Sequence, residues 1–184
     1  MVPMISLGIA ILIILYLIIA YNSLVKLKNM AEEGWSGIDV QLKKRYNLIP
    51  NLVSTVKGYA SHEKEVFENV SAMRSTGINA ETVKQQANAE NMLTQALGKL
   101  FAVAENYPDL RANQNFMELQ NELSQIEKDI ELARRYYNGT VRENNIKIES
   151  FPSNIVANMF SFKKFDFFEI DDQSIKTTPK VDFS

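Results

Sequence analysis

The first 25 residues of this chain carry no charged side chain, and nearly all residues from Val2 to Tyr21 are aliphatic. A helix rises about 1.5 Å per residue, so a run of about 20 residues is roughly 30 Å long, which matches the hydrocarbon core of a bilayer. A cleaved signal peptide fits less well, because no Lys or Arg precedes the run and no A-x-A-like site follows it. We therefore expect residues 1–25 to form a retained transmembrane anchor.

Basic residues lie only on the C-terminal side of this apolar run, beginning with Lys26 and Lys28. Lys and Arg next to a membrane span favour the cytoplasmic side, whereas Glu32 and Glu33 contribute little to that bias. We expect a single-pass protein of the cell membrane, in contact with the lipid bilayer, with its body in the cytoplasm.

The rest of the chain, about 160 residues, is enough for one domain. The net charge of −2 argues against a nucleic-acid partner, which favours a clear basic surplus. The chain has no cysteine, which excludes disulfides, thiol catalysis and thiolate metal sites.

Apolar residues recur at steps of three and four along most of this body, with polar residues between them. This spacing is typical of helices packed in a bundle or a coiled coil, and no comparable stretch alternates with period two. The fold class is therefore predicted to be all-α. The apolar stripes run over 35–60, 89–107 and 116–137, and we expect helices near 4–59, 62–75, 80–106, 110–149 and 153–160.

Helix-capping and helix-breaking residues set these boundaries. Ser61 is the expected N-cap of the second helix, Gly77 its end, and Asn79 the N-cap of the third. Pro108 ends the third helix, and Pro152 is expected in the first turn of the last one. The pair Asn138-Gly139 is a weak point of the fourth helix.

Pro50 lies inside the first predicted helix, where it removes the hydrogen bond to the carbonyl of Tyr46 and should kink the helix. Two groups of polar residues stand out as candidate interaction sites. One is Arg45, Asn47 and Asn51 with Pro50, and the other is Arg134, Arg135 and Asn138. Two interpretations stay open: a polar notch that recognises a partner or a second copy, or side chains that satisfy the backbone and cover apolar surface.

A phenylalanine-rich segment follows the last predicted helix, from Phe160 to Phe168. Its candidate interaction residues are Phe162, Phe165, Phe167 and Phe168. Burying such side chains is favourable, so the segment should dock on its own bundle, on a neighbouring subunit, or on the membrane beside Lys163 and Lys164. The polar stretch after it has the composition of a loop or a disordered tail.

The residues offer no candidate active site. His62 is the only histidine, whereas a di-metal site in a helical bundle needs Glu-x-x-His from two helices. The acidic residues at 32–33 and 166–172 resemble solvated surface and no calcium loop, and no nucleophile motif or phosphate loop is present. We expect no catalytic, cofactor or metal site, and no enzyme activity.

Several segments carry a resemblance to a known family. They are Tyr21-Asn-Ser-Leu-Val25, Trp35-Ser-Gly-Ile-Asp-Val-Gln-Leu-Lys-Lys-Arg45-Tyr-Asn-Leu-Ile-Pro50-Asn-Leu-Val53, Ala133-Arg-Arg-Tyr-Tyr-Asn138, Phe151-Pro-Ser-Asn-Ile155 and Pro179-Lys-Val-Asp-Phe183. Together they resemble the LemA family of bacterial membrane proteins over nearly the whole chain. The resemblance implies a single-pass anchor and an up-and-down, mostly antiparallel four-helix bundle. It brings no established reaction, and it raises self-assembly and membrane partners such as proteases as expectations.

The sequence thus predicts an anchor over 1–25, a helical bundle over 26–160 and a phenylalanine-rich, then polar, tail over 161–184. The expected function is that of a non-catalytic scaffold or self-assembling module, a homo-oligomer at the membrane. The alternative is an adaptor that binds a membrane protein such as a membrane protease.

Overall fold

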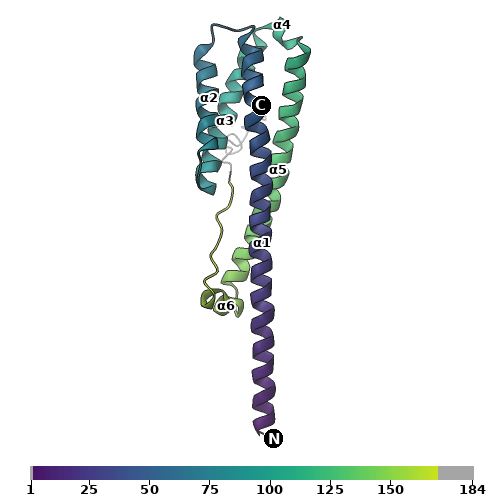
Figure 1. Ribbon diagram of the computed structural model, residues 1–184, viewed down its shortest axis with the longest axis vertical. Coiled ribbons are helices and arrows are strands. Elements are labelled where there is room, and N and C mark those ends of the chain that lie inside the picture. Colours follow the sequence, from purple (N-terminus) through teal and green to yellow (C-terminus); the bar gives the residue numbers. More distant parts are fainter. Residues whose placement is uncertain (1, 170–184) are drawn as a thin grey trace, which may run out of the picture. The chain divides into compact units, whose positions relative to one another are not determined.

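The computed structural model of the chain describes residues 2–169, and all regular structure in this range is helical. The predicted all-α class is therefore confirmed. The helices are α1 (Val2–Lys57), α2 (Lys64–Ile78), α3 (Val83–Glu105), α4 (Pro108–Arg111), α5 (Gln114–Glu149) and α6 (Ser153–Met159) (Figure 1). The polar tail predicted after the phenylalanine-rich segment lies outside the described residues.

The described chain divides into two compact units, and α1 and α5 each contribute to both. Unit 1 contains residues 2–41 and 128–167, and unit 2 contains residues 42–127 with 168–169. These units follow the packing of the helices. The functional division predicted above, into 1–25, 26–160 and 161–184, stays a prediction.

Unit 2 is a bundle of four helical segments: the end of α1, then α2, α3 and the beginning of α5, with the short α4 between the last two. Successive segments run in opposite directions (Figure 1). The apolar stripes predicted from the sequence contribute most of its interior, because many of their members are buried. Fully buried examples are Ile49, Val56, Leu93 and Leu100.

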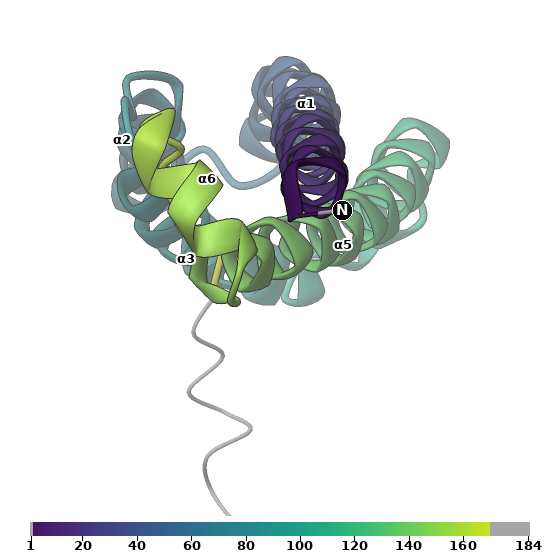
Figure 2. The same ribbon diagram turned by 90° about the horizontal axis from the view of Figure 1, so that it is seen from below.

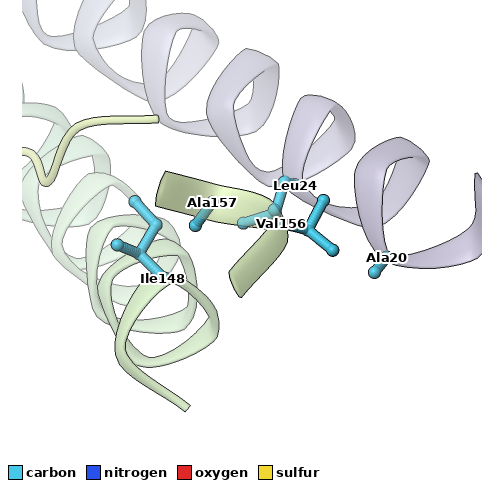
Figure 3. Close-up of a cluster of buried hydrophobic side chains, with 5 residues drawn as sticks. All are labelled: Ala20, Leu24, Ile148, Val156 and Ala157. Atoms are coloured by element: carbon cyan, nitrogen blue, oxygen red, sulfur yellow. The ribbon is translucent and has the colours of Figure 1, made fainter. Parts of the chain in front are cut away.

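Unit 1 combines the beginning of α1 with the end of α5, the short α6 and the segment that follows it. Its apolar cluster consists of Ala20 and Leu24 of α1, Ile148 of α5, and Val156 and Ala157 of α6 (Figure 3). Further along, the rings of Trp35 and Tyr137 pack in a tilted arrangement with centroids 5.5 Å apart. Gly34 permits this close approach, because a Cβ there would lie 3.1 Å from the Cα of Tyr137.

Three of the residues predicted to begin or end helices have other roles. α2 begins after Glu63, so Ser61 is not its N-cap, and it continues through Gly77 to Ile78. Gly77 is buried inside α2 and does not end it. A Cβ at this position would lie 2.5 Å from the Tyr46 hydroxyl, so the glycine permits α1 and α2 to pack closely.

Asn79 is the C-cap of α2 and not the N-cap of α3. The N-cap of α3 is Thr82, whose hydroxyl accepts from the backbone N–H of Gln85 at 3.2 Å. The Gln85 side chain in turn accepts from the N–H of Thr82, which completes a capping box.

The remaining boundaries agree with the sequence to within a few residues. α5 runs unbroken through Asn138 and Gly139, so the suspected weak point does not interrupt it. Pro108 opens the short α4, and Pro152 immediately precedes α6 instead of lying in its first turn. α1 continues through Pro50 as one uninterrupted helix.

Candidate functional site

The most unusual feature of unit 2 is a charged side chain in its interior. Arg45 of α1 is only 2% exposed, and its guanidinium reaches two other helices. Nη1 donates to Oε2 of Glu90 at 2.6 Å, and Nη2 donates to Oγ1 of Thr94 at 2.8 Å, both on α3. Nη2 also lies 2.8 Å from Oε1 of Glu127 on α5. One arginine therefore connects α1, α3 and α5.

The carboxylate of Glu90 is completely buried and has three donors. Besides Arg45, it accepts from the hydroxyl of Tyr46 and from Nε2 of Gln86, the latter at 3.0 Å. Gln86 also donates to the Tyr46 hydroxyl at 2.7 Å. A buried charge is tolerated only when it is paired and hydrogen-bonded, and this arrangement meets that requirement. We call the set Arg45, Tyr46, Gln86, Glu90, Thr94 and Glu127 the Arg45 cluster.

The charges of the Arg45 cluster are one guanidinium and two carboxyl groups. Burial raises the pKa of Glu127, and the nearby Glu90 raises it further, while Arg45 opposes the shift. Burial and Glu90 also raise the pKa of Tyr46 well above its usual range. The Tyr46 hydroxyl is thus kept neutral, as a donor to Glu90 and an acceptor from Gln86, and is not poised as a base or nucleophile.

Glu127 is the member of the Arg45 cluster that meets solvent, with 40% of its side chain exposed. It lies at the edge of a pocket of about 450 Å³ between α3 and α5, which Arg45 also lines. Leu97, Phe101 and Leu123 give this pocket a largely apolar wall. Protons can therefore reach Glu127 from the solvent, whereas Glu90 is sealed from it.

Pro50 is connected to this region through the backbone. A proline at position 50 cannot donate to the carbonyl of Tyr46, and that carbonyl instead accepts a hydrogen bond of 2.7 Å from Nε of Arg74 on α2. The side chain of one helix thus replaces the bond that another helix lacks. Pro50 and Arg74 also line a pocket of about 400 Å³ between these helices.

The structure separates the residues of the first predicted interaction group. Arg45 lies in the interior, where it lines the pocket between α3 and α5, while Asn47, Pro50 and Asn51 are exposed on α1. Whether the three exposed residues bind a partner stays a prediction.

The second predicted group belongs to unit 1. Arg135 is exposed and pairs with Glu131 one turn earlier on α5. Arg134 and Asn138 are half-buried on the same helix. An exposed i,i+4 pair contributes little to stability, so the role of this group in recognition also stays a prediction.

Part of the phenylalanine-rich segment docks on its own chain, as one of the three alternatives predicted. In unit 1, Asn145 donates to the carbonyl of Phe165 at 2.9 Å and accepts from its N–H at 3.0 Å. Tyr137 donates to the carbonyl of Asp166 at 2.8 Å. Phe162 and Phe165 are half-buried, Phe167 is exposed, and Phe168 is buried in unit 2.

Sequence reasoning missed Gln86, Glu90, Thr94 and Glu127. Gln86 and Glu90 are spaced four residues apart and precede Leu93 and Leu97 at helical spacing, so polar residues inside an apolar stripe were the available signal. Within residues 2–169, no three His, Cys, Asp or Glu side chains are grouped closely enough to hold a metal ion. His62 is exposed.

The described helices include one, α1, that is long and apolar enough near its N-terminus to cross a membrane. Comparison with known protein families matches residues 34–183, most of the body that follows this segment, to the LemA family. The chain belongs to the LemA family. The resemblance seen in the sequence is therefore confirmed.

Curated relatives of this LemA-family chain include magnetosome proteins. It is 26% identical over 179 residues to magnetosome protein MamQ 2 of Paramagnetospirillum magneticum, which covers 83% of this chain and 66% of the relative. Magnetosome protein MamQ of Magnetospirillum gryphiswaldense is 24% identical, with 83% and 65% covered. Protein LemA of Metamycoplasma hominis is 26% identical over 161 residues, with 85% and 74% covered. The chain thus spans just under two thirds of the length of these MamQ relatives.

These relatives and the apolar part of α1 together support a location at the membrane. The orientation of the body relative to the membrane is a separate matter and stays a prediction.

Proposed function

We propose that this LemA-family protein is a non-catalytic scaffold that associates with copies of itself in the plane of a membrane. The observation that carries the proposal is a set of large apolar side chains that are exposed in unit 1, on α5 and on the part of α1 after its apolar run. Leu132 is 60% exposed on α5, and Tyr136 and Val40 are also exposed, all in unit 1. Exposed apolar side chains on long helices favour lateral contacts between copies.

The continuity of α1 supports the same proposal. One helix contains both the apolar N-terminal run and residues of the body, with no flexible linker between them. An anchor of this kind holds copies parallel in one bilayer and raises their effective concentration. A weak lateral contact then becomes significant.

The closed character of the Arg45 cluster favours a structural role over catalysis. The charged atoms of Arg45 and Glu90 point at one another and at neighbouring side chains, and Glu90 is sealed from solvent. A catalytic group needs access to a substrate, and the accessible member, Glu127, pairs with Arg45. We assign the Arg45 cluster to holding the helices of unit 2 in register.

The test is the mass of the full-length protein in mild detergent, measured by light scattering. We expect oligomers for the wild type and smaller species for Leu132→Glu and Val40→Glu, because a charge at an apolar contact opposes association. Met117→Glu changes an exposed apolar residue of unit 2 and serves as the control that should keep the wild-type mass. A chain that begins at Lys26 should associate more weakly than the full-length protein.

Monomers from both the wild type and the chain that begins at Lys26 would end the scaffold proposal. The better account would then be an adaptor for another membrane protein, such as a membrane protease. The exposed Asn47, Pro50 and Asn51 beside the pocket at Arg74 favour that alternative as a docking surface. Crosslinking in cells from Asn51→Cys, in a chain without other cysteines, would identify such a partner.

A further inference from the structure

The short helix α6 packs directly on the last turns of the apolar run. Val156 and Ala157 of α6 are buried against Ala20 and Leu24 of α1, and Leu17 packs on the same cluster (Figure 3). α6 therefore lies beside residues 17–24 of α1. In the view from the N-terminal end of α1, α6 extends to one side of the end of α5 (Figure 2).

Residues 17–24 of α1 mark the edge of the hydrocarbon core if α1 crosses a membrane. An apolar run from Val2 to Tyr21 spans roughly 30 Å, which is the thickness of that core, and the first charge follows at Lys26. Tyr21 lies at this edge, with its ring 4.7 Å from that of Phe160 and 5.8 Å from that of Phe162. Aromatic side chains gather at such interfaces. The depth of α6 is thus the boundary between lipid tails and headgroups.

The surface of α6 that faces away from α1 is also apolar. Phe151, just before the helix, is 80% exposed, and Ile155 and Met159 are 55% and 59% exposed. Ile155 and Met159 are four residues apart in α6 and share one face, Phe151 lies just before this helix, and Ser153, Val156 and Ala157 form the buried face. A helix with apolar residues on both its packed and its outward face is unusual in water and normal where lipid covers it.

Basic residues also lie in the same unit as α6. Lys26, Lys163 and Lys164 are exposed there, and Lys164 pairs with Glu149 at 2.6 Å. Lysine side chains at a membrane surface extend to the headgroups and are attracted by anionic lipids. Lys163 and Lys164, which follow α6 closely in the chain, are therefore suited to a lipid surface.

We propose that α6 is an interfacial helix, with Phe151, Ile155 and Met159 immersed at the lipid–headgroup boundary next to the membrane span. The membrane then contacts this protein at two places, along the apolar part of α1 and under α6. The proposal depends on α1 crossing the bilayer and is independent of self-association.

The test places a fluorophore at single cysteines of the full-length protein in vesicles of phosphatidylcholine and phosphatidylglycerol. The chain has no cysteine of its own, so Ile155→Cys and Met159→Cys give unique labels. Ile14→Cys, in the apolar run, is the lipid control, and Met117→Cys, exposed in unit 2, is the water control. Quenching by iodide reports water, and quenching by lipids brominated on the acyl chain reports lipid.

We expect labels at positions 155 and 159 to be quenched several-fold more by brominated lipid, and several-fold less by iodide, than the label at position 117. Iodide quenching equal to that at position 117 would overturn the proposal. Protection from both quenchers would also overturn it, because a protein surface, such as a second copy, would then cover α6. Far-ultraviolet circular dichroism of each variant verifies that the helices are retained.

Discussion

At the scale of single residues, the decisive feature is a buried arginine that pairs with one carboxyl group in the interior of a small bundle and with a second at its edge. A buried ion pair contributes little net stability over an apolar replacement, but removing one partner leaves an unpaired charge in the interior. The three donors to Glu90 avoid this cost at the carboxylate. The Arg45 cluster therefore fixes which faces of α1, α3 and α5 meet.

Replacing Glu90 by Gln should strongly destabilise the protein. The change removes the charge that pairs with Arg45 in a completely buried site, and breaking such a pair costs on the order of 3–5 kcal/mol. Glu131→Gln removes an exposed pair on α5 and should change the unfolding free energy by less than about 1 kcal/mol. Urea unfolding in detergent followed by circular dichroism measures both. Equal stability of the two variants would show that the buried pair is dispensable.

The raised pKa of Glu127 predicts a pH dependence with a definite sign. Burial lets the folded protein hold a proton that the unfolded chain releases, so the unfolding free energy should fall as the pH rises above 4.5, the ordinary pKa of the group. Glu127→Gln should remove this fall. Glu131, whose pKa Arg135 lowers, contributes in the opposite direction, so Glu131→Gln should leave the fall in place. Thermal melts between pH 4 and pH 7 give the comparison, and an unchanged slope in Glu127→Gln would refute the assignment.

At the scale of elements, α1 and α2 are held together by a side-chain hydrogen bond to the backbone as well as by apolar contact. The carbonyl of Tyr46 is unpaired within α1 because of Pro50, and Arg74 of α2 supplies the missing donor. A proline inside a helix is costly when its freed carbonyl has no partner. Here the freed carbonyl becomes an attachment point between α1 and α2.

A double-mutant cycle tests this attachment. Arg74→Met should lower the unfolding free energy by about 1–3 kcal/mol, because it leaves a part-buried carbonyl unsatisfied. In a Pro50→Ala background, the N–H of residue 50 can bond to Tyr46, so the cost of Arg74→Met should be smaller there. Lys57→Met, another basic side chain at the same pocket, is the control. An equal cost of Arg74→Met in both backgrounds would contradict the proposed compensation.

At the scale of the whole molecule, two long helices contribute to both compact units, and one of them carries the apolar run. The lysines that follow this run favour a cytoplasmic body. The orientation is open to a direct test because the natural chain lacks cysteine.

We expect Ser61→Cys, exposed in the loop between α1 and α2, to be protected from a membrane-impermeant maleimide in intact cells. The same variant should react fully once the membrane is permeabilised. His62→Cys, the neighbouring exposed position, should behave identically and rules out a local effect. Labelling of both positions in intact cells would place the body on the outer side.

Sequence alone determined the helical class, the apolar N-terminal run and most of the apolar core, because each depends on periodicity and composition that a helix imposes locally. Leu123 and Ile126, in an unbroken stripe, are buried as expected. The LemA resemblance likewise followed from contiguous segments. Gly77, however, was predicted to end a helix. Its real role depends on contact with Tyr46, which is 31 residues away in the sequence and cannot be found from a local pattern.

Only the tertiary structure decided which polar residues are buried and which partners they have. Arg45 and Asn47 are two positions apart on one helix, yet one is buried and the other exposed. Glu127 lies between apolar stripe positions, where a solvated side chain is expected, and it instead pairs with Arg45. The physical reason is that a charge is stable in the interior only when partners from distant parts of the chain converge on it. A helical pattern specifies which face of a helix is turned inward, but the packing of α1, α3 and α5 specifies which side chains meet there.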